Sequence, residues 1–205
     1  MHLEAIKLER QKVFKKLTAF PNFFLVGGTA LALQIGHRIS VDFDLFSEKD
    51  LSKDLFNKIK RVFKDSNINR IVNRSGHLGV VVDGVKIDFV FCEFPFISDM
   101  IDFEGIKMVP ISEIAAMKAY ALSFRGTLKD YVDMYFILKD GYANLQEIEK
   151  IADKKYGAEF NIKLFIQQLV WWEDLKRENI EFLKEPVSEE QMKKFFEQEI
   201  SKIKL

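Results

Sequence analysis

The sequence contains one cysteine, Cys92, and no long apolar run among its 205 residues. A single cysteine excludes an internal disulfide framework and is typical of proteins in a reducing compartment. No stretch approaches the ~20 apolar residues that cross a bilayer, and the charged amino terminus lacks the apolar centre of a signal peptide. These absences predict a cytoplasmic protein with no membrane partner.

The sequence also lacks an excess of charge of either sign. It holds 31 Lys and Arg residues against 31 Asp and Glu residues, for a formal net charge of +0. A generic polyanion binder gains its affinity from many phosphate contacts, so a neutral total argues against that class and leaves only a local basic patch open. The histidines share no metal-ligand spacing, and no Ser/His/Asp or Cys/His arrangement is present.

Short apolar runs fill the first half of the chain, and helical patterns fill the second. Strands are predicted at 23–26, 41–46, 79–83 and 85–91, and helices at 3–18, 29–35 and 51–65. Asp83-Gly84 between two β-branched runs predicts a tight hairpin. Further helices are predicted at 112–124, 128–139, 144–156, 160–172 and 189–203, the last with a capping box from Ser188 to Gln191. This order predicts an α+β core at 1–110 and a helical part at 111–205.

Two aspartates alternate with apolar residues in the run VDFDLF at 41–46. Side chains of a strand alternate between its faces, so Asp42 and Asp44 are expected on one face. Adjacent carboxylates repel each other unless a cation lies between them, and Mg²⁺ prefers such oxygen ligands. A half-exposed strand with acids facing water is the alternative, and it is the commoner explanation of such a pair taken by itself.

A glycine turn precedes the aspartates, where the strand at 23–26 leads through Gly27, Gly28 and Thr29 into a helix. Glycine lets the backbone approach a ligand closely, the helix N-terminus offers N–H groups to phosphate oxygens, and Thr29 adds a hydroxyl. A tight turn without function is the alternative for these three residues alone. Combined with the aspartates, they predict a phosphate-binding turn beside a metal site.

Gly27-Gly28, followed after thirteen residues by Asp42-Phe43-Asp44, resembles the signature of the DNA polymerase beta-type nucleotidyltransferases. The string GGTALALQIGHRISVDFDLF is similar to the AbiEii/AbiGii toxin family within that superfamily, where Arg38 and Ser40 match residues that commonly precede the aspartates. The resemblance extends over about 23–138. It implies a nucleotidyltransferase-like α+β core with a small mixed β-sheet flanked by helices, and transfer of a nucleotide from an NTP with magnesium.

The same resemblance implies a third carboxylate on a neighbouring strand, for which Asp88 is the candidate. Two Mg²⁺ ions are then expected on Asp42, Asp44 and Asp88, where one ion orients the triphosphate and the other activates the attacking hydroxyl. Asp83 competes with Asp88, although its place in the hairpin explains it without function. The nucleotide would be bound by Gly27, Gly28, Thr29, Arg38, Ser40 and Lys118.

Two matches to the toxin family lie in the helical part. Lys118 corresponds to a lysine that acts at the nucleotide phosphates, whereas a lysine whose amine simply reaches water is the alternative. The block RGTLKDYVDMYFIL corresponds to one that supplies an acid to the active site. Asp130 and Asp133 share a helical face, so spacing does not rank them, and Asp130 is favoured slightly. The helical part is therefore expected to complete the active site.

The resemblance predicts an NTP- and Mg²⁺-dependent nucleotidyltransferase of the AbiEii toxin type, whose acceptor is an RNA 3′ end, with tRNA the leading candidate. By the same resemblance, a cognate antitoxin is an expected partner. One alternative is a catalytically inactive nucleotide-binding or regulatory module with the same fold. The other is an interaction protein whose aspartates are only surface residues.

Overall fold

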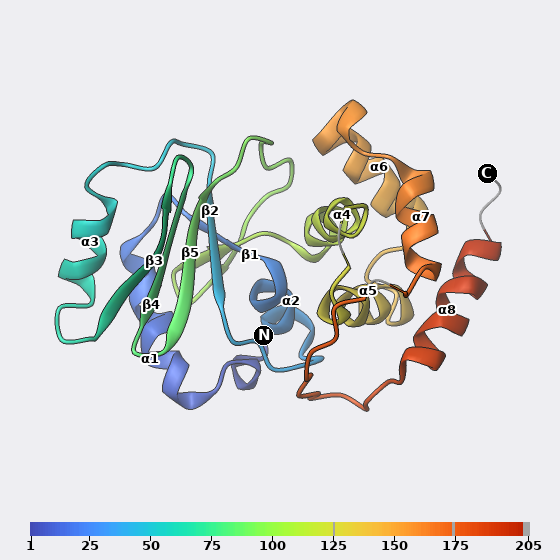
Figure 1. Cartoon of the computed structure of the whole chain (residues 1–205), viewed down its shortest axis with the longest axis horizontal. Helices are drawn as coiled ribbons and strands as arrows, with labels where there is room; N and C mark the ends of the chain where they lie inside the picture. Colours follow the sequence, from blue (N-terminus) through green and yellow to red (C-terminus); the bar gives the residue numbers. More distant parts are fainter. Residues whose placement is uncertain (125, 174, 203–205) are drawn as a thin grey trace. The chain divides into compact units, whose positions relative to one another are not determined.

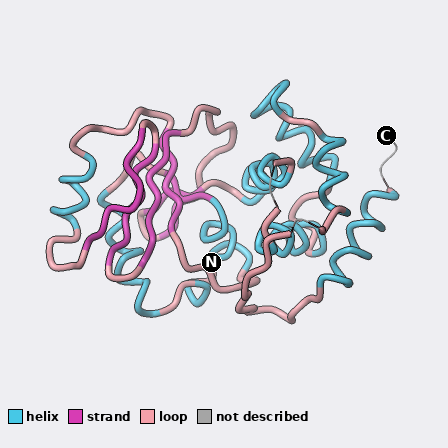
Figure 2. The backbone as a smooth tube through the Cα atoms, in the orientation of Figure 1, coloured by secondary structure: helices cyan, strands magenta, loops and turns pink. Residues whose placement is uncertain are grey.

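The computed structural model describes residues 1–124, 126–173 and 175–202. The chain divides into two compact units, Met1–Val109 and Pro110–Leu205. The named strands all belong to the first unit, and the named elements of the second are helical (Figures 1 and 2). The predicted α+β core followed by helices is confirmed.

The first unit is built on a seven-stranded mixed sheet with the order β3-β4-β5-β2-β1-β7-β6. β2 pairs in parallel with β5, and β1 with β7, whereas the other neighbours are antiparallel. The elements after the amino-terminal turns are α1 (Leu8–Lys16), β1 (Phe24–Val26), α2 (Gly27–Ile35), β2 (Phe43–Ser47), α3 (Leu55–Val62), β3 (Ile68–Arg74), β4 (His77–Val82), β5 (Val85–Phe91), β6 (Ile101–Phe103) and β7 (Ile106–Met108).

The predicted hairpin joins β4 to β5. Asp83 has φ of 49° and Gly84 has φ of 81°, which are the positive values that a tight two-residue turn needs. The turn fixes the register of the hairpin, so that Gly79 lies opposite Asp88. Gly36, in the left-handed conformation, ends α2 where the sequence predicts a stop.

The predicted opening helix at 3–18 is wrong as a single helix. The structure has a 3-10 turn at Leu3–Ala5, then α1, then a second 3-10 turn at Leu17–Ala19. Ile6 is extended and buried, and the backbone N–H of Ser40 donates to the carbonyl of Ala5. This hydrogen bond attaches the amino-terminal turn to the loop before β2, and the extended backbone at Ile6 interrupts the predicted helix.

β3 was not predicted, because its seven residues show no alternation of buried and exposed side chains. It pairs only with β4 at the edge of the sheet, and most of its side chains are exposed. An edge strand of this kind is specified by its neighbour more than by its own pattern.

The second unit contains α4 (Ile111–Leu122), α5 (Leu128–Lys139), α6 (Leu145–Tyr156), α7 (Ile162–Val170) and α8 (Glu189–Ser201). Each corresponds to a predicted helix, and the capping box between Ser188 and Gln191 is present. An aromatic group of Tyr131, Trp172 and Phe196 packs between α5 and α8. No helix among the described residues is long and apolar enough to span a membrane.

Candidate functional site

Two of the predicted carboxylates lie side by side in the middle of the sheet. β2 and β5 are parallel neighbours, and Asp44 on β2 is in register with Asp88 on β5. Residues paired in this way project to the same face of a sheet, about 4.8 Å apart. The apolar neighbours Phe43 and Leu45 are buried on the other face, so that the alternation of β2 presents Asp44 away from the core.

A glycine stands against each of these two carboxylates. A Cβ on Gly27, at the start of α2, would lie 2.8 Å from Oδ2 of Asp44. A Cβ on Gly79 of β4 would lie 2.7 Å from Oδ1 of Asp88. A real Cβ atom essentially never lies this close to another heavy atom, so both positions need glycine for the carboxylates to keep their places. Gly27 also has φ of 68°, a conformation that L side chains rarely adopt.

Asp88 is buried and balanced by two basic side chains. Nε2 of His77 lies 2.8 Å from one carboxylate oxygen, and Nζ of Lys86 lies 2.5 Å from the other. Burial by itself would raise the pKa of Asp88, but the hydrogen bonds from Lys86 and His77 outweigh it and hold this pKa below its usual value. The carboxylate is therefore ionised at neutral pH.

Asp42 lies just before β2 and is half-buried, so it is not a strand residue as predicted. Its backbone carbonyl accepts a hydrogen bond from the hydroxyl of Thr29 on α2. The hydrogen bond to Asp88 raises the pKa of Lys86, and the negative charges of Asp42 and Asp44 add to this rise. All three predicted acids thus act on one lysine that sequence reasoning missed.

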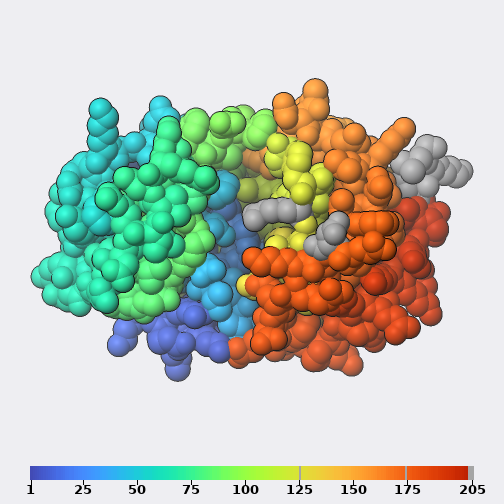
Figure 3. Space-filling model, in the orientation of Figure 1, coloured from blue at the N-terminus to red at the C-terminus, as the bar shows by residue number. Residues whose placement is uncertain are grey.

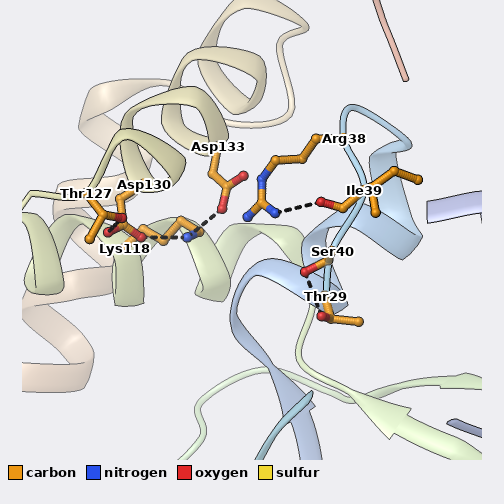
Figure 4. A network of polar contacts seen from close by, with 8 residues as sticks. All are labelled: Thr29, Arg38, Ile39, Ser40, Lys118, Thr127, Asp130 and Asp133. Atoms are coloured by element: carbon orange, nitrogen blue, oxygen red, sulfur yellow. Dashed lines mark hydrogen bonds and ion pairs between the residues drawn. The ribbon is translucent and has the colours of Figure 1, made fainter. Parts of the chain in front are cut away.

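The start of α2 is joined to the loop that precedes the aspartates. The hydroxyls of Thr29 and Ser40 lie 2.7 Å apart (Figure 4). A Cβ on Gly28 would lie 2.5 Å from Nη2 of Arg38, whose Nη1 donates to the carbonyl of Ile39. The structure therefore brings together the residues predicted for nucleotide binding in this unit, Gly27, Gly28, Thr29, Arg38 and Ser40.

In the helical unit, Lys118 of α4 is the centre of a second charged cluster (Figure 4). Its amine lies 2.9 Å from Asp130 and 2.6 Å from Asp133, both on α5. Only 9% of the Lys118 side chain is exposed. The amine is enclosed by carboxylates, so the alternative of an amine that reaches water is wrong.

The two aspartates of α5 differ in exposure. Asp133 has a fully buried side chain, whereas 19% of the Asp130 side chain is exposed. Burial tends to raise the pKa of Asp130, but the charge of Lys118 and the hydrogen bond from Thr127 lower it overall. Asp130 is the more accessible of the two acids. Arg125, which belongs to the same sequence block, lies outside the described residues.

The acids of the sheet provide hard oxygen ligands, and glycine leaves space beside Asp44. Nevertheless, no group of three His, Cys, Asp or Glu side chains within the described residues is arranged to hold a metal ion. At Asp88, Lys86 and His77 each contact one of the two carboxylate oxygens. Asp42 and Asp44 therefore fit a divalent cation better than the full set of three acids does.

A comparison with known protein families identifies the family of this chain. Residues 12–205 match the model for "Nucleotidyl transferase AbiEii toxin, Type IV TA system". The chain belongs to this AbiEii family. It is therefore a nucleotidyltransferase toxin of a toxin–antitoxin family, and an NTP is the substrate class that this family implies.

Similar proteins extend the comparison over nearly the whole AbiEii-family chain. An uncharacterized protein of Aquifex aeolicus, aq_aa25, is 30% identical over 203 residues, which cover 97% of each chain. MenT4, a nucleotidyltransferase toxin from Mycobacterium tuberculosis, superposes with a TM-score of 0.59 at 11% identity over 94% of this chain and 83% of its own. JHP933 from Helicobacter pylori gives 0.52 at 18% identity, over 80% and 88%. These solved structures support the nucleotidyltransferase-like fold.

Three residues around the predicted acids of the AbiEii chain were missed: His77, Lys86 and Thr127. The hairpin contains a signal for two of them. A two-residue turn at 83–84 places Gly79 opposite Asp88, so His77 and Lys86, each two residues along its strand, share that face. No comparable signal identifies Thr127, whose hydroxyl lies 2.6 Å from Asp130.

Proposed function

We propose that this AbiEii-family protein transfers a nucleotide from an NTP to the 3′ hydroxyl of an RNA, with tRNA as the first acceptor to test and Mg²⁺ as the required ion. The observation that carries the proposal is the register of Asp44 with Asp88, with the start of α2 against Asp44. This arrangement supports a site in which acids and a helix N-terminus meet one triphosphate.

The α2 turn is proposed to bind the phosphates. Gly27 and Gly28 leave no side chain between the backbone and Asp44 or Arg38. N–H groups at a helix N-terminus attract phosphate oxygens, and the N-cap residue of α2, Val26, makes no side-chain hydrogen bond to them. The Arg38 guanidinium, fixed on the carbonyl of Ile39, adds positive charge beside Gly28. The Thr29–Ser40 contact holds the loop of Asp42 against this turn.

The acids of the sheet are proposed to hold the ion. Asp42 and Asp44 would be its first ligands, and Asp88 would complete the set where it gives up its contact with Lys86 or His77. When bound, Mg²⁺ would neutralise charge on the triphosphate and on the leaving pyrophosphate. The lowered pKa of Asp88 supports this role, because only an ionised carboxylate binds a cation well.

The transfer forms one bond to phosphorus and breaks one, and the acceptor hydroxyl gives up its proton to water. The acceptor hydroxyl oxygen attacks the α-phosphorus of the NTP, and the bond from that phosphorus to the pyrophosphate oxygen breaks. The nucleotide is then attached to the acceptor, and pyrophosphate leaves. Lys118 and Asp130 are proposed to assist the transfer, with the lysine offsetting phosphate charge. Their support is the family membership and the mutual burial of the pair.

The test is incubation of the full chain with each labelled NTP, Mg²⁺ and total cellular RNA, followed by separation of tRNA, other RNA and protein. Label on the tRNA fraction is the expected result, and it should disappear in Asp42→Asn/Asp44→Asn. Asp65→Asn/Asp99→Asn is the matched control, because it removes two exposed acids of the same unit and makes the same change in net charge. Label on protein or on another RNA would exclude the tRNA assignment.

A second candidate is favoured by one observation, namely that both oxygens of Asp88 are paired with basic side chains. A nucleotide-binding module without turnover would tolerate such pairing permanently. It would bind NTP with Mg²⁺ and label no acceptor in the same assay. A cognate antitoxin is also proposed as a partner, supported by the toxin–antitoxin family, and co-purification with the product of a neighbouring gene would test it.

A further inference from the structure

A pocket in the helical unit lies beside the Lys118 cluster and has no part in the proposed phosphate or metal chemistry. Its volume is about 350 Å³, within the range of small-molecule sites. Its lining includes Phe124, Thr127, Tyr131, Trp171 and Lys176. In Figure 3 the later part of this unit is coloured from orange to red.

Two aromatic side chains of this pocket are unusually accessible. Phe124 is 65% exposed and Trp171 is 45% exposed, whereas the adjacent Trp172 is 4% exposed. Trp172 donates its Nε1 hydrogen to the carbonyl of Leu169 and packs on Tyr131, so it is a core residue. The two adjacent tryptophans therefore differ in environment, because the ring of Trp172 lies in the core and Trp171 lines the pocket.

The wall of the pocket is held by hydrogen bonds between segments distant in sequence. The hydroxyl of Tyr131 lies 2.7 Å from the carbonyl of Gln168 and 3.1 Å from that of Trp171, which fixes the end of α7. Burial raises the pKa of Tyr131 to about 12, so this hydroxyl remains a donor at any physiological pH. The backbone N–H of Leu128 donates to the carbonyl of Lys176, which fixes the opposite wall.

The pocket is also connected to the cluster on α4 and α5. Thr127 lines the pocket, and its hydroxyl lies 2.6 Å from Asp130, which in turn contacts Lys118. Gly126 packs so tightly that a Cβ would lie 2.7 Å from the ring of Tyr131. A ligand that contacts Thr127 would therefore be separated by this one side chain from Asp130, the acid that the family resemblance favours for the active site.

We propose that this pocket binds a nucleobase, stacked on Trp171 and Phe124, with Lys176 available to the attached phosphate. Flat π-surfaces bind every base, because each base has a π-face, and a nearby cation attracts the phosphodiester. The proposal rests on the nucleotidyltransferase function above. That function gives the nucleobase two sources, namely the NTP and the single-stranded acceptor. Both sources share one chemistry.

Fluorescence tests the proposal, because the sequence has only two tryptophans. In Trp172→Phe, Trp171 is the single reporter, and stacking of a base should quench its emission. Each NTP without RNA, and separately a single-stranded oligoribonucleotide without NTP, is titrated into this variant. Quenching by NTP alone assigns the pocket to the donor base, and quenching by the oligonucleotide alone assigns it to the acceptor. The proposal is overturned if neither ligand quenches the emission at concentrations up to about 5 mM, which covers even weak binding.

Affinity measurements on the native tryptophan background provide the second test. Calorimetry with each NTP and with the oligoribonucleotide should show that Trp171→Ala weakens binding of at least one of them by roughly 5- to 150-fold, and that Trp171→Phe retains most of that affinity. Val170→Ala is the control, because Val170 is 44% exposed on the same segment but does not line the pocket. Equal affinity in all three variants would also overturn the proposal.

The outcome for the pocket is separable from the outcome for the proposed function. Wild-type transfer activity with no quenching of Trp171 would reject the pocket and keep the function. Quenching with no transfer to any acceptor would keep the pocket and reject the function. If Trp172→Phe unfolds, the calorimetric comparison of Trp171→Ala with Val170→Ala remains decisive, because both keep Trp172.

Discussion

The two units place their charges differently. In the helical unit, Lys155 and Glu113 form a pair in which both side chains are fully buried, and Lys118 is enclosed by Asp130 and Asp133. In the α+β unit, Asp42 and Asp44 are half-buried, and Lys86, which balances Asp88, is 43% exposed. Buried charge pairs hold a fold in one arrangement, because separating them leaves a charge without water. The acids of the α+β unit instead stay close together beside water, as expected if they bind the cation of the proposed site.

The largest effect on stability is expected at the fully buried pair. Lys155→Ala leaves Glu113 without this cation and should lower the free energy of unfolding by about 3–5 kcal/mol. Lys154→Ala is the control, because Lys154 is an exposed neighbour and its loss should change stability by less than about 0.5 kcal/mol. Urea denaturation measures both. Similar small losses in the two variants would show that the buried pair is not needed to hold the helical unit.

Lys118→Ala should lower the free energy of unfolding less, by about 2–3 kcal/mol, because Asp130 is partly exposed and keeps its bond to Thr127. Lys118→Arg retains the charge and should recover most of this stability. Transfer assays below the melting temperature of each variant then separate the roles of the lysine. Full activity in Lys118→Ala would limit Lys118 to a structural role.

Gly27→Ala tests the close approach in the α+β unit. Its cost is expected to be about 1–2 kcal/mol of stability from the positive φ, together with displacement of the Asp44 carboxylate and loss of transfer. Gly84→Ala is matched in conformation, with φ of 81°, but nothing lies within 4 Å of the added Cβ. It should lose similar stability and keep its transfer activity. Equal transfer activity in the two variants would show that the close approach of Gly27 to Asp44 is not needed for transfer.

The smallest effect concerns pH. The pKa of Asp88 is lowered in the folded state, so this group stabilises the fold above its unfolded pKa of about 3.9, and the contribution is lost as pH falls through the lowered value. Lys86→Met should therefore reduce the free energy of unfolding at pH 6 by about 0.5–1 kcal/mol, since Lys86 is 43% exposed. The difference from wild type should vanish near pH 2. A constant difference at all pH values would assign the loss to packing.

The sequence predicted an α+β core followed by helices, the Asp83-Gly84 hairpin, the helices after residue 111 and the group of polar residues around α2 and β2. These features depend on local patterns, namely periodicity, turn residues and capping. It did not predict β3, whose pairing with β4 is set by the neighbouring strand. It also extended β2 to Asp42, because alternation alone does not show where pairing with a neighbour begins.

The balance of charge around the acids was the least predictable feature. Lys118 was assigned to phosphate, yet two aspartates of another helix hold its amine, and this depends on the packing of α4 on α5. His77 and Lys86 could have been inferred from the hairpin register, but that they pair with both oxygens of Asp88 depends on their rotamers. Partners of this kind are fixed by tertiary structure.

The most direct test of the central claim is the stabilisation of the folded protein by NTP with Mg²⁺, measured as a shift in melting temperature. A ligand at 100 times its dissociation constant stabilises the folded state by about 2.7 kcal/mol. This stabilisation is expected in wild type and in Asp65→Asn/Asp99→Asn, and it should be lost in Asp42→Asn/Asp44→Asn, which should itself fold normally. An equal shift in all three proteins would contradict the claim that the acids of the sheet hold the nucleotide through a divalent ion.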